Sequence, residues 1–108
     1  EIPKVNNNVK IIKGCFKNTL PNFFKSTKEK ISFMHIDCDT YESTKDVFNN
    51  INYDLFQNNS LILFDEYMSY WGWKENVFKA WQEYVKENNI KYEYVLFGKV
   101  QALVKIIK

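Results

Sequence analysis

The chain has 108 residues, of which 15 are Lys or Arg and 13 are Asp or Glu, so its net charge is +2. A chain of this length forms one domain, and it buries roughly 60 to 70% of its unfolded surface in one modest core. Because 45% of the residues are hydrophobic and the charges are nearly balanced, the composition excludes a disordered chain. A net charge of +2 also does not indicate that the protein binds nucleic acid.

The two cysteines, Cys15 and Cys38, are far apart, there is no CxxC motif, and the chain has a single histidine. Neither a zinc site nor a disulfide framework is therefore predicted, and reduced thiols are expected. The sequence shows no signal peptide pattern and no apolar run near the roughly 20 residues that span a bilayer. These features predict a cytoplasmic protein without a membrane partner, and a piece of a longer polypeptide.

The first predicted elements are a strand and a short helix. Residues 9–14, VKIIKG, are expected to form a strand that ends at Gly14. Thr19 is then expected to cap a helix with Pro21 in its first turn, where proline is tolerated. Leu20, Phe23 and Phe24 would share one side of this helix.

The middle of the chain repeats a strand and helix pattern. Residues 31–37, ISFMHID, are apolar at both odd and even positions, which is typical of a strand covered on both faces in a parallel sheet. A helix is predicted to begin at Ser43 or Thr44. Its apolar positions at helical spacing are Val47, Phe48, Ile51 and Leu55.

The second repeat is a strand over residues 60–67, SLILFDEY, followed by an aromatic loop and a helix over residues 75–88. Asn88 and Asn89 are expected to end this helix. Its inward stripe would consist of Val77, Phe78, Trp81 and Val85.

Two further strands, at residues 91–98 and 101–108, follow with a very short connection. This connection permits only an antiparallel hairpin, because a parallel return needs a dozen or more residues. The predicted fold class is therefore an open α/β sheet with a terminal antiparallel hairpin.

Acidic residues follow the two central strands. Asp37 and Asp39 come after the first of them, and Asp65 and Glu66 end the second. If these strands are neighbours, the carboxylates share the edge of the sheet where ligands bind in such folds. Two charges about 4 Å apart repel by roughly 4 kcal/mol at an effective dielectric near 20, so the cluster needs a shared proton or a cation. All-oxygen ligands favour magnesium first, with calcium or manganese as alternatives.

A metal site is not the only role that these acids allow. Each acid could merely cap the helix or turn behind it. Three enzyme classes use a DxD motif after an apolar strand. Haloacid-dehalogenase-type phosphatases need a Thr or Val where this chain has Tyr41, and nucleotide-sugar glycosyltransferases do not predict a second acidic strand end.

The third class fits better. The segments IKGCFKNTLPNFF, FMHIDCDTYESTKDVF, LILFDEY and WKENVFKAWQEY occur in this order. In combination they resemble the carboxyl-terminal half of the macrocin O-methyltransferase-like family, from about Val9 onward. Members of that family are class I S-adenosylmethionine-dependent methyltransferases with a Rossmann-like sheet, and they act largely on hydroxyl groups of sugars and other natural products.

The resemblance implies roles for particular residues. Gly14, Cys15 and Phe16 match the turn that borders the adenine of the cofactor. Asp37 matches an aspartate that binds magnesium in metal-dependent relatives, and Asp65 and Glu66 match the acidic pair that completes that site. Glu66 is the least secure of these ligands, because relatives often have Asp or Asn there.

Magnesium held by these carboxylates would lower the pKa of an acceptor hydroxyl and orient it toward the methyl group. Asp39 is either the general base or the cap of the helix behind it. His35 is either a core histidine, the interpretation we favour, or a catalytic one.

An aromatic loop follows the second acidic strand end. Its residues either form the wall of the acceptor site or pack on their own domain. They are Tyr67, Tyr70, Trp71 and Trp73, with Gly72 among them.

Class I methyltransferases hold the cofactor mainly with a glycine-rich turn, and this chain has only three glycines. The family's strand order in the sheet is 3-2-1-4-5-7-6. It implies that strands 1 and 2, which would lie in the sheet between the strands of residues 9–14 and 31–37, are missing. The exposed edge of residues 31–37 then predicts mispairing or a homo-oligomer. Two hypotheses follow: this chain is the metal and acceptor half of an O-methyltransferase, inactive alone, or it is a non-catalytic binding or assembly module.

Overall fold

The computed structural model describes residues 2–108 and contains one four-stranded sheet with the order β1-β2-β4-β3. Strands β1 (Ile31–Ile36) and β2 (Phe56–Phe64) are parallel neighbours. Strands β3 (Lys91–Phe97) and β4 (Ala102–Ile107) form an antiparallel hairpin, and β4 also pairs antiparallel with β2. The predicted parallel pair with a terminal hairpin is confirmed.

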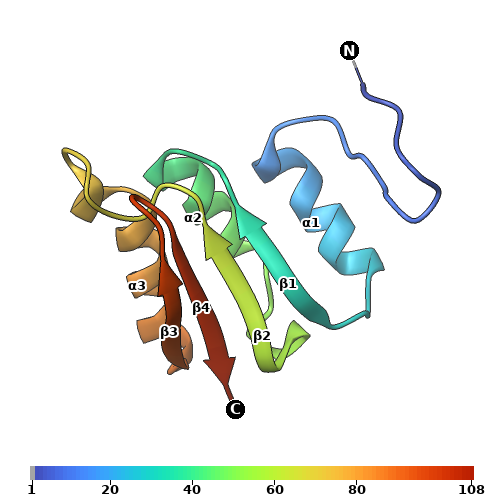
Figure 1. Cartoon of the computed structure of the whole chain (residues 1–108). Helices are drawn as coiled ribbons and strands as arrows, with labels where there is room; N and C mark the ends of the chain where they lie inside the picture. The colour runs from blue at the N-terminus through green and yellow to red at the C-terminus, as the bar shows by residue number, and fades with distance from the viewer. Residues whose placement is uncertain (1) are drawn as a thin grey trace.

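Helices α2 (Tyr41–Asn49) and α3 (Val77–Asn88) lie together behind the sheet in the view of Figure 1. Helix α1 (Phe16–Ser26) lies beside α2, and two short 3-10 helices, η1 (Tyr53–Leu55) and η2 (Trp73–Glu75), precede β2 and α3. Within residues 2–108, none of the helices has the length and apolar character needed to cross a bilayer.

The structure moves the start of the first helix. It begins at Phe16, and the cap residue is Cys15, which makes no side-chain hydrogen bond. The prediction that Thr19 caps this helix is therefore wrong. Instead, the Thr19 hydroxyl donates to the Cys15 carbonyl oxygen at 3.0 Å. Pro21 therefore lies in the helix interior rather than in the first turn, where its missing N–H removes one backbone hydrogen bond.

The second helix also begins earlier than predicted. Thr40 is its cap, and the Thr40 hydroxyl accepts a hydrogen bond from the Ser43 N–H at 3.2 Å. This bond satisfies one of the free N–H groups of the first turn, which is the physical reason that threonine is favoured there. The predicted stop of the third helix is confirmed, because Asn89 adopts the left-handed conformation with φ 52°.

The predicted strand over residues 9–14 is absent. These residues have no regular secondary structure, and the side chains of Val9, Ile11 and Ile12 are exposed. They lie beyond α1, away from the sheet (Figure 1). An extended segment needs a neighbouring strand to pair its backbone groups, and no strand of the described part of the chain lies beside this one.

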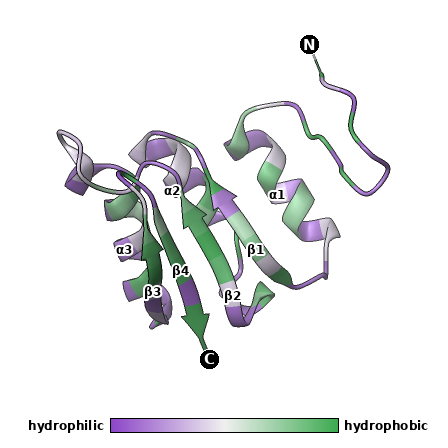
Figure 2. Ribbon diagram, in the orientation of Figure 1, coloured by the Kyte–Doolittle hydropathy of each residue, from purple (hydrophilic) through white to green (hydrophobic). Residues whose placement is uncertain are grey.

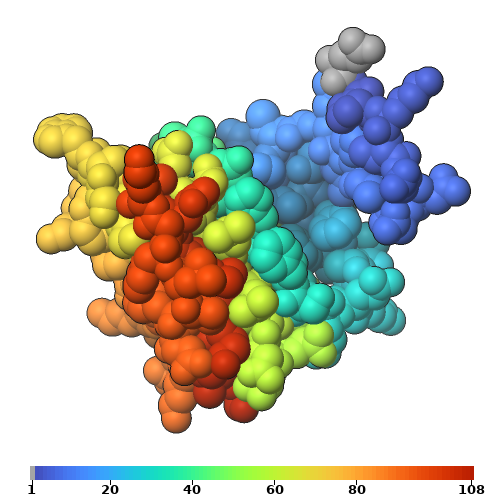
Figure 3. Space-filling model, in the orientation of Figure 1, coloured from blue at the N-terminus to red at the C-terminus, as the bar shows by residue number. Residues whose placement is uncertain are grey.

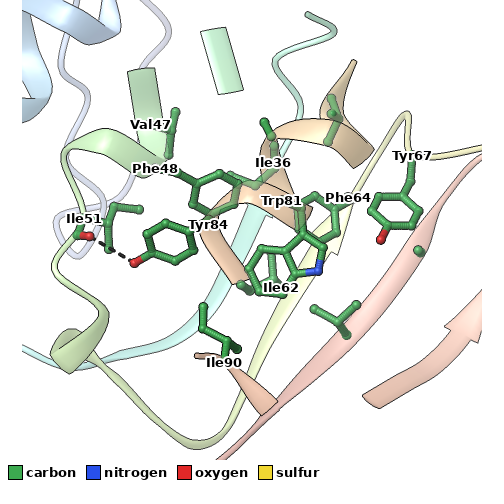
Figure 4. Close-up of a cluster of buried hydrophobic side chains, with 14 of the residues drawn as sticks. Ile36, Val47, Phe48, Ile51, Ile62, Phe64, Tyr67, Trp81, Tyr84 and Ile90 are labelled. Carbon is green, nitrogen blue, oxygen red and sulfur yellow. Dashed lines mark hydrogen bonds between the residues drawn. The ribbon is translucent and has the colours of Figure 1, made fainter. Parts of the chain in front are cut away.

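The core lies between the sheet and helices α2 and α3 (Figure 4). Trp81 is fully buried, with its ring 5.3 Å from that of Phe64 and 5.6 Å from that of Phe48. Phe48 stacks on Tyr84 at 4.6 Å, and the Tyr84 hydroxyl donates to the Ile51 carbonyl oxygen at 3.0 Å. Most of the predicted inward positions are buried: Val47, Phe48, Ile51, Val77 and Trp81. The other three, Leu55, Phe78 and Val85, are only partly buried, and α2 ends at Asn49, before Ile51 and Leu55.

No helix of residues 2–108 lies over the opposite face of the sheet, and its strands form the surface in Figure 3. Strand pairing places His35, Leu63, Leu103 and Leu96 in one row across this face, and much of it is hydrophobic in Figure 2. Phe33 is 54% exposed, so the prediction that its strand is covered on both faces is wrong for this chain. The reason is that α2 and α3 cover the same face.

Candidate functional site

The acidic ends of β1 and β2 lie side by side. Ile36 pairs with Phe64, and the Asp65 N–H donates to the Ile36 carbonyl oxygen at 3.0 Å, so the pairing continues one residue past the strands. Both strands point to the same edge of the sheet (Figure 1). Asp37 and Asp65 therefore leave two adjacent strands at the same level.

The electrostatics of this pair are unfavourable without a bound cation or proton. The negative charge of Asp65 is the largest cause that raises the pKa of Asp37, followed by loss of hydration and a hydrogen bond with Asp65. Asp39 raises this pKa further, and His35 opposes the increase. A carboxyl group whose pKa is raised by a neighbouring carboxylate favours binding of positive charge at that position.

Two side chains contact Asp65 from opposite sides. His35 Nε2 lies 3.9 Å from Asp65 Oδ1, and the Gln101 amide donates to the same oxygen at 3.0 Å. His35 is on the uncovered face with 44% of its side chain exposed, so the favoured prediction of a core histidine is wrong. Sequence reasoning missed Gln101, because its position beside Asp65 depends on the register of β4 against β2.

Asp39 has an unusual backbone conformation. Its φ is 63°, in the left-handed region that aspartate tolerates better than most residues. Because Thr40 provides the cap of α2, the predicted capping role of Asp39 does not hold. Non-glycine residues in this region carry roughly 1 to 3 kcal/mol of strain and cluster at functional sites. Its charge also raises the pKa of Asp37, which places it near the pair.

The charge of Glu66 acts on Tyr70, whereas that of Asp65 acts on Asp37. Burial is the largest cause that raises the pKa of Tyr70, and the charge of Glu66 raises it further. The Tyr70 hydroxyl donates to the Glu66 carbonyl oxygen at 3.1 Å. Glu66 is not among the charged residues that raise the pKa of Asp37. Across residues 2–108, no three side chains of His, Cys, Asp or Glu converge as a group able to hold a metal. The donors that the structure brings together are the carboxylates of Asp37 and Asp65.

The donor chemistry of this pair fits a hard cation. Magnesium is commonly bound through one or two carboxylates, with waters and substrate oxygens completing the shell. Cys38 lies between the acids but is half-buried, and burial raises the pKa of its thiol, so it provides no thiolate. Both cysteines are free in the structure.

The aromatic loop divides into buried and exposed residues. Tyr67 is 2% exposed, and its hydroxyl lies 2.7 Å from that of Tyr94, so its ring belongs to the core. Trp73 packs edge-on against Phe78 at 5.0 Å. Trp71 is 98% exposed and follows the acidic strand end, so it is the ring available to a ligand.

The residues matched to the cofactor turn line one shallow cavity. Gly14, Cys15 and Phe16 surround a space of about 330 Å³ with Lys17, Ser43 and Asp46, at the amino end of α1. Gly14 has φ 137°, and a Cβ atom there would lie 2.7 Å from Thr19 Cγ2. Glycine is therefore required at this turn for both conformation and space.

These features define a class of protein. Parallel strands with helices on the sheet, and polar groups beyond the carboxyl ends of those strands, are typical of Rossmann-like α/β domains. The family model for Macrocin-O-methyltransferase (TylF) matches residues 4–99. The chain belongs to this family.

Solved structures share the fold. "Structure of the O-methyltransferase NovP" is 24% identical with a TM-score of 0.76, and the match covers 96% of this chain and 40% of that one. The apo structure of CalS11, described as a TDP-rhamnose 3'-O-methyltransferase of calicheamicin biosynthesis, is 20% identical with a TM-score of 0.66 and is matched over 87% of this chain and 39% of its own. This chain therefore spans about two fifths of the length of these structures. A comparison with curated protein sequences found no match.

Proposed function

We propose that this chain is the metal and acceptor part of an S-adenosylmethionine-dependent O-methyltransferase that acts on a hydroxyl group of a sugar or other natural product. The observation that carries the proposal is the pairing of Asp37 and Asp65 at adjacent strand ends. The family supports methyl transfer, and the described activities of NovP and CalS11 support an oxygen acceptor. The cofactor half would come from the strands that the family's order places between residues 9–14 and β1.

In this proposal Asp37 and Asp65 would hold a magnesium ion, with Glu66 as the predicted third ligand. A bound divalent cation supplies polarisation of an acceptor oxygen, which lowers the pKa of the hydroxyl group. Asp37 and Asp65 contribute two negative charges at one edge of the sheet, and these oxygen ligands would suit a hard cation without a thiolate or imidazole ligand.

Asp39 is the proposed general base. A base must lie within hydrogen-bond reach of the proton that it removes, and Asp39 is exposed beside the Asp37 carboxylate. Gly14, Cys15 and Phe16 would border the cofactor, whose sulfonium supplies the methyl group. The cavity at the amino end of α1 supports this placement.

The acceptor wall consists in this proposal of Trp71 and Trp73. Trp71 is free to stack on a sugar ring, and Trp73 is fixed by Phe78. Tyr67 is the third residue that the sequence suggests for this wall. Its ring is buried and its hydroxyl is hydrogen-bonded to that of Tyr94, so in this proposal it would support the wall from the core.

A matched pair of variants tests the metal role. Asp37→Ala removes one of the paired carboxylates, and Asp54→Ala removes an exposed aspartate at the opposite end of the sheet. In an enzyme that joins this chain to a cofactor-binding part, Asp37→Ala should lower the rate of methyl transfer by more than the roughly 10- to 100-fold that loss of an outer partner costs. Asp54→Ala should leave the rate unchanged.

Magnesium or manganese titration of the 108-residue chain by calorimetry gives a second measurement. Binding should disappear in Asp37→Ala and persist in Asp54→Ala, with equal thermal unfolding midpoints. A rate of methyl transfer that is the same with and without added magnesium would refute the metal role.

A non-catalytic α/β binding or assembly module is the second candidate. It is favoured by the uncovered apolar face of the sheet. Calorimetry with S-adenosylhomocysteine separates the two. Micromolar binding by this chain would exclude the module, and binding that appears only with an upstream segment would support the enzyme.

Two further predictions belong to this proposal. A cytoplasmic location is predicted because both cysteines are free, and disulfides are rare in the cytosol. A homo-oligomer through the unpaired edge of β1 is predicted because free strand edges recruit other strands. Size-exclusion chromatography with light scattering measures the second.

A further inference from the structure

Asp65 lies between β1 on one side and the turn that joins β3 to β4 on the other. Phe64 pairs with Ala102 in β4, so Gln101, the residue before Ala102, is next to Asp65. The Gln101 amide donates to Asp65 Oδ1 at 3.0 Å. On its other side Asp65 faces Asp37, whose pKa is raised by the charge of Asp65, by loss of hydration and by a side-chain hydrogen bond between the two acids.

The backbone fixes this turn against the acidic loop. The Val100 carbonyl oxygen accepts hydrogen bonds from the N–H groups of Tyr67 at 2.7 Å and Met68 at 3.1 Å. The Gly98 N–H donates to the Gln101 carbonyl oxygen at 3.0 Å and closes the turn. The loop that carries Asp65 and the turn that carries Gln101 are therefore joined at several points.

Gly98 leaves space for the Gln101 side chain. A Cβ atom at position 98 would lie only 2.5 Å from Gln101 Oε1. The backbone of Gly98 is not in the left-handed region, so glycine is not needed there for its conformation. Its small size is what permits the amide to lie against the turn and reach Asp65.

We propose that Gln101 is a positioning residue for Asp65: its hydrogen bond to Oδ1 fixes the orientation of the carboxylate that, together with Asp37, would hold the cation. This inference rests on the proposed metal role of the pair. Ligating carboxylates are typically oriented by outer hydrogen-bond partners. A neutral amide suits this task, because it fixes the carboxylate without adding a positive charge that would repel the cation.

The test compares two glutamine variants of the 108-residue chain. Gln101→Met keeps the length of the side chain and removes the donor. Gln57→Met makes the same change at an exposed glutamine near the other end of β2, where the side chain makes no hydrogen bond within residues 2–108. Manganese titration by calorimetry should show affinity weaker by about 10- to 100-fold for Gln101→Met and unchanged for Gln57→Met.

A second variant acts on the same amide from the turn. Gly98→Ala should displace the Gln101 amide and weaken manganese binding, but it should add nothing in the Gln101→Met background. Thermal unfolding of each variant provides the control for a purely structural effect. Equal manganese affinity in Gln101→Met and the unchanged chain would overturn the inference, as would fully additive effects of the two substitutions.

The hydrogen bond itself has a readout that needs no metal. In an NMR spectrum, the side-chain amide signal of Gln101 should shift in Asp65→Ala and stay in place in Asp54→Ala. If the unchanged chain binds no manganese, the metal role and this inference both fail. If it binds manganese and Gln101→Met binds equally well, the inference alone fails.

Discussion

The pentapeptide Val-Lys-Ile-Ile-Lys occurs twice, at residues 9–13 and at residues 104–108, and the two copies have different structures. The first copy has no regular secondary structure, with Val9 49% and Ile11 39% exposed. In the second, most residues belong to β4, and Val104 and Ile106 are completely buried. The difference shows that strand propensity alone does not form a strand here.

The surroundings of the two copies account for the difference. Strand β4 is central and pairs with β2 on one side and β3 on the other, while α3 covers its inward face. Residues 9–13 have no paired strand, and the neighbouring helix α1 contains no buried residue. A backbone that pairs on both sides and a side chain that enters a core offset the conformational entropy of ordering the segment.

Hydrogen exchange should give the largest contrast between the two copies. Amide protons of residues 104–107 are expected to exchange only through large-scale unfolding, whereas those of residues 9–13 should exchange at nearly the rate of an unfolded chain. Exchange measured by NMR or mass spectrometry tests this. Strong protection of residues 9–13 would show that they pair with another strand in solution.

The same substitution at equivalent positions should separate the copies in stability. Ile106→Ala removes a fully buried side chain and should lower the free energy of unfolding by about 2 to 5 kcal/mol. Ile11→Ala changes an exposed side chain and should alter it by less than about 0.5 kcal/mol. Urea unfolding followed by tryptophan fluorescence measures both, and similar losses would contradict the comparison.

High pH should destabilise the folded core through its buried tyrosines. Burial is the largest cause that raises the pKa of Tyr67 and of Tyr84 well above the ordinary tyrosine value of about 10. A group with a raised pKa in the folded state stabilises fully below its unfolded pKa, and this stability is lost as the pH rises through the folded pKa. The contribution of these tyrosines to the urea midpoint of unfolding should therefore be constant below about pH 10 and fall above it.

Tyr84→Phe provides the control for the pH effect. The variant loses the hydrogen bond to the Ile51 carbonyl oxygen but removes one titrating group, so its stability should decline less steeply above pH 10. An equal decline in the variant and the unchanged chain would mean that Tyr84 does not contribute.

Helix caps should give the smallest contrast. Thr40→Ala removes the side-chain cap of α2 and should lower the free energy of unfolding by about 1 kcal/mol. Cys15→Ser offers a cap to α1, where no side-chain bond exists, and should raise helix content slightly. Circular dichroism with thermal unfolding measures both, and a loss of helix content in Cys15→Ser would show that Cys15 is needed as it is.

Much of the fold was predictable from local pattern. The short connection predicted the β3-β4 hairpin, and helical spacing found the buried positions Val77 and Trp81. The acids Asp37 and Asp65 were predicted as neighbours because parallel strands share one carboxyl edge. Two features were not predictable: the lack of regular structure in residues 9–14, and the exposure of the sheet face on which His35 lies. Both depend on neighbours that the local sequence does not specify.

The sequence alone therefore determined which segments can form helices and strands, and it placed acidic residues after the two central strands. The tertiary structure decided which copy of the pentapeptide becomes a strand, which aromatic rings are buried, and which side chain holds Asp65. The physical reason is that periodicity is a local property, whereas pairing register, burial and the contact between Gln101 and Asp65 require segments that are distant in the chain to meet.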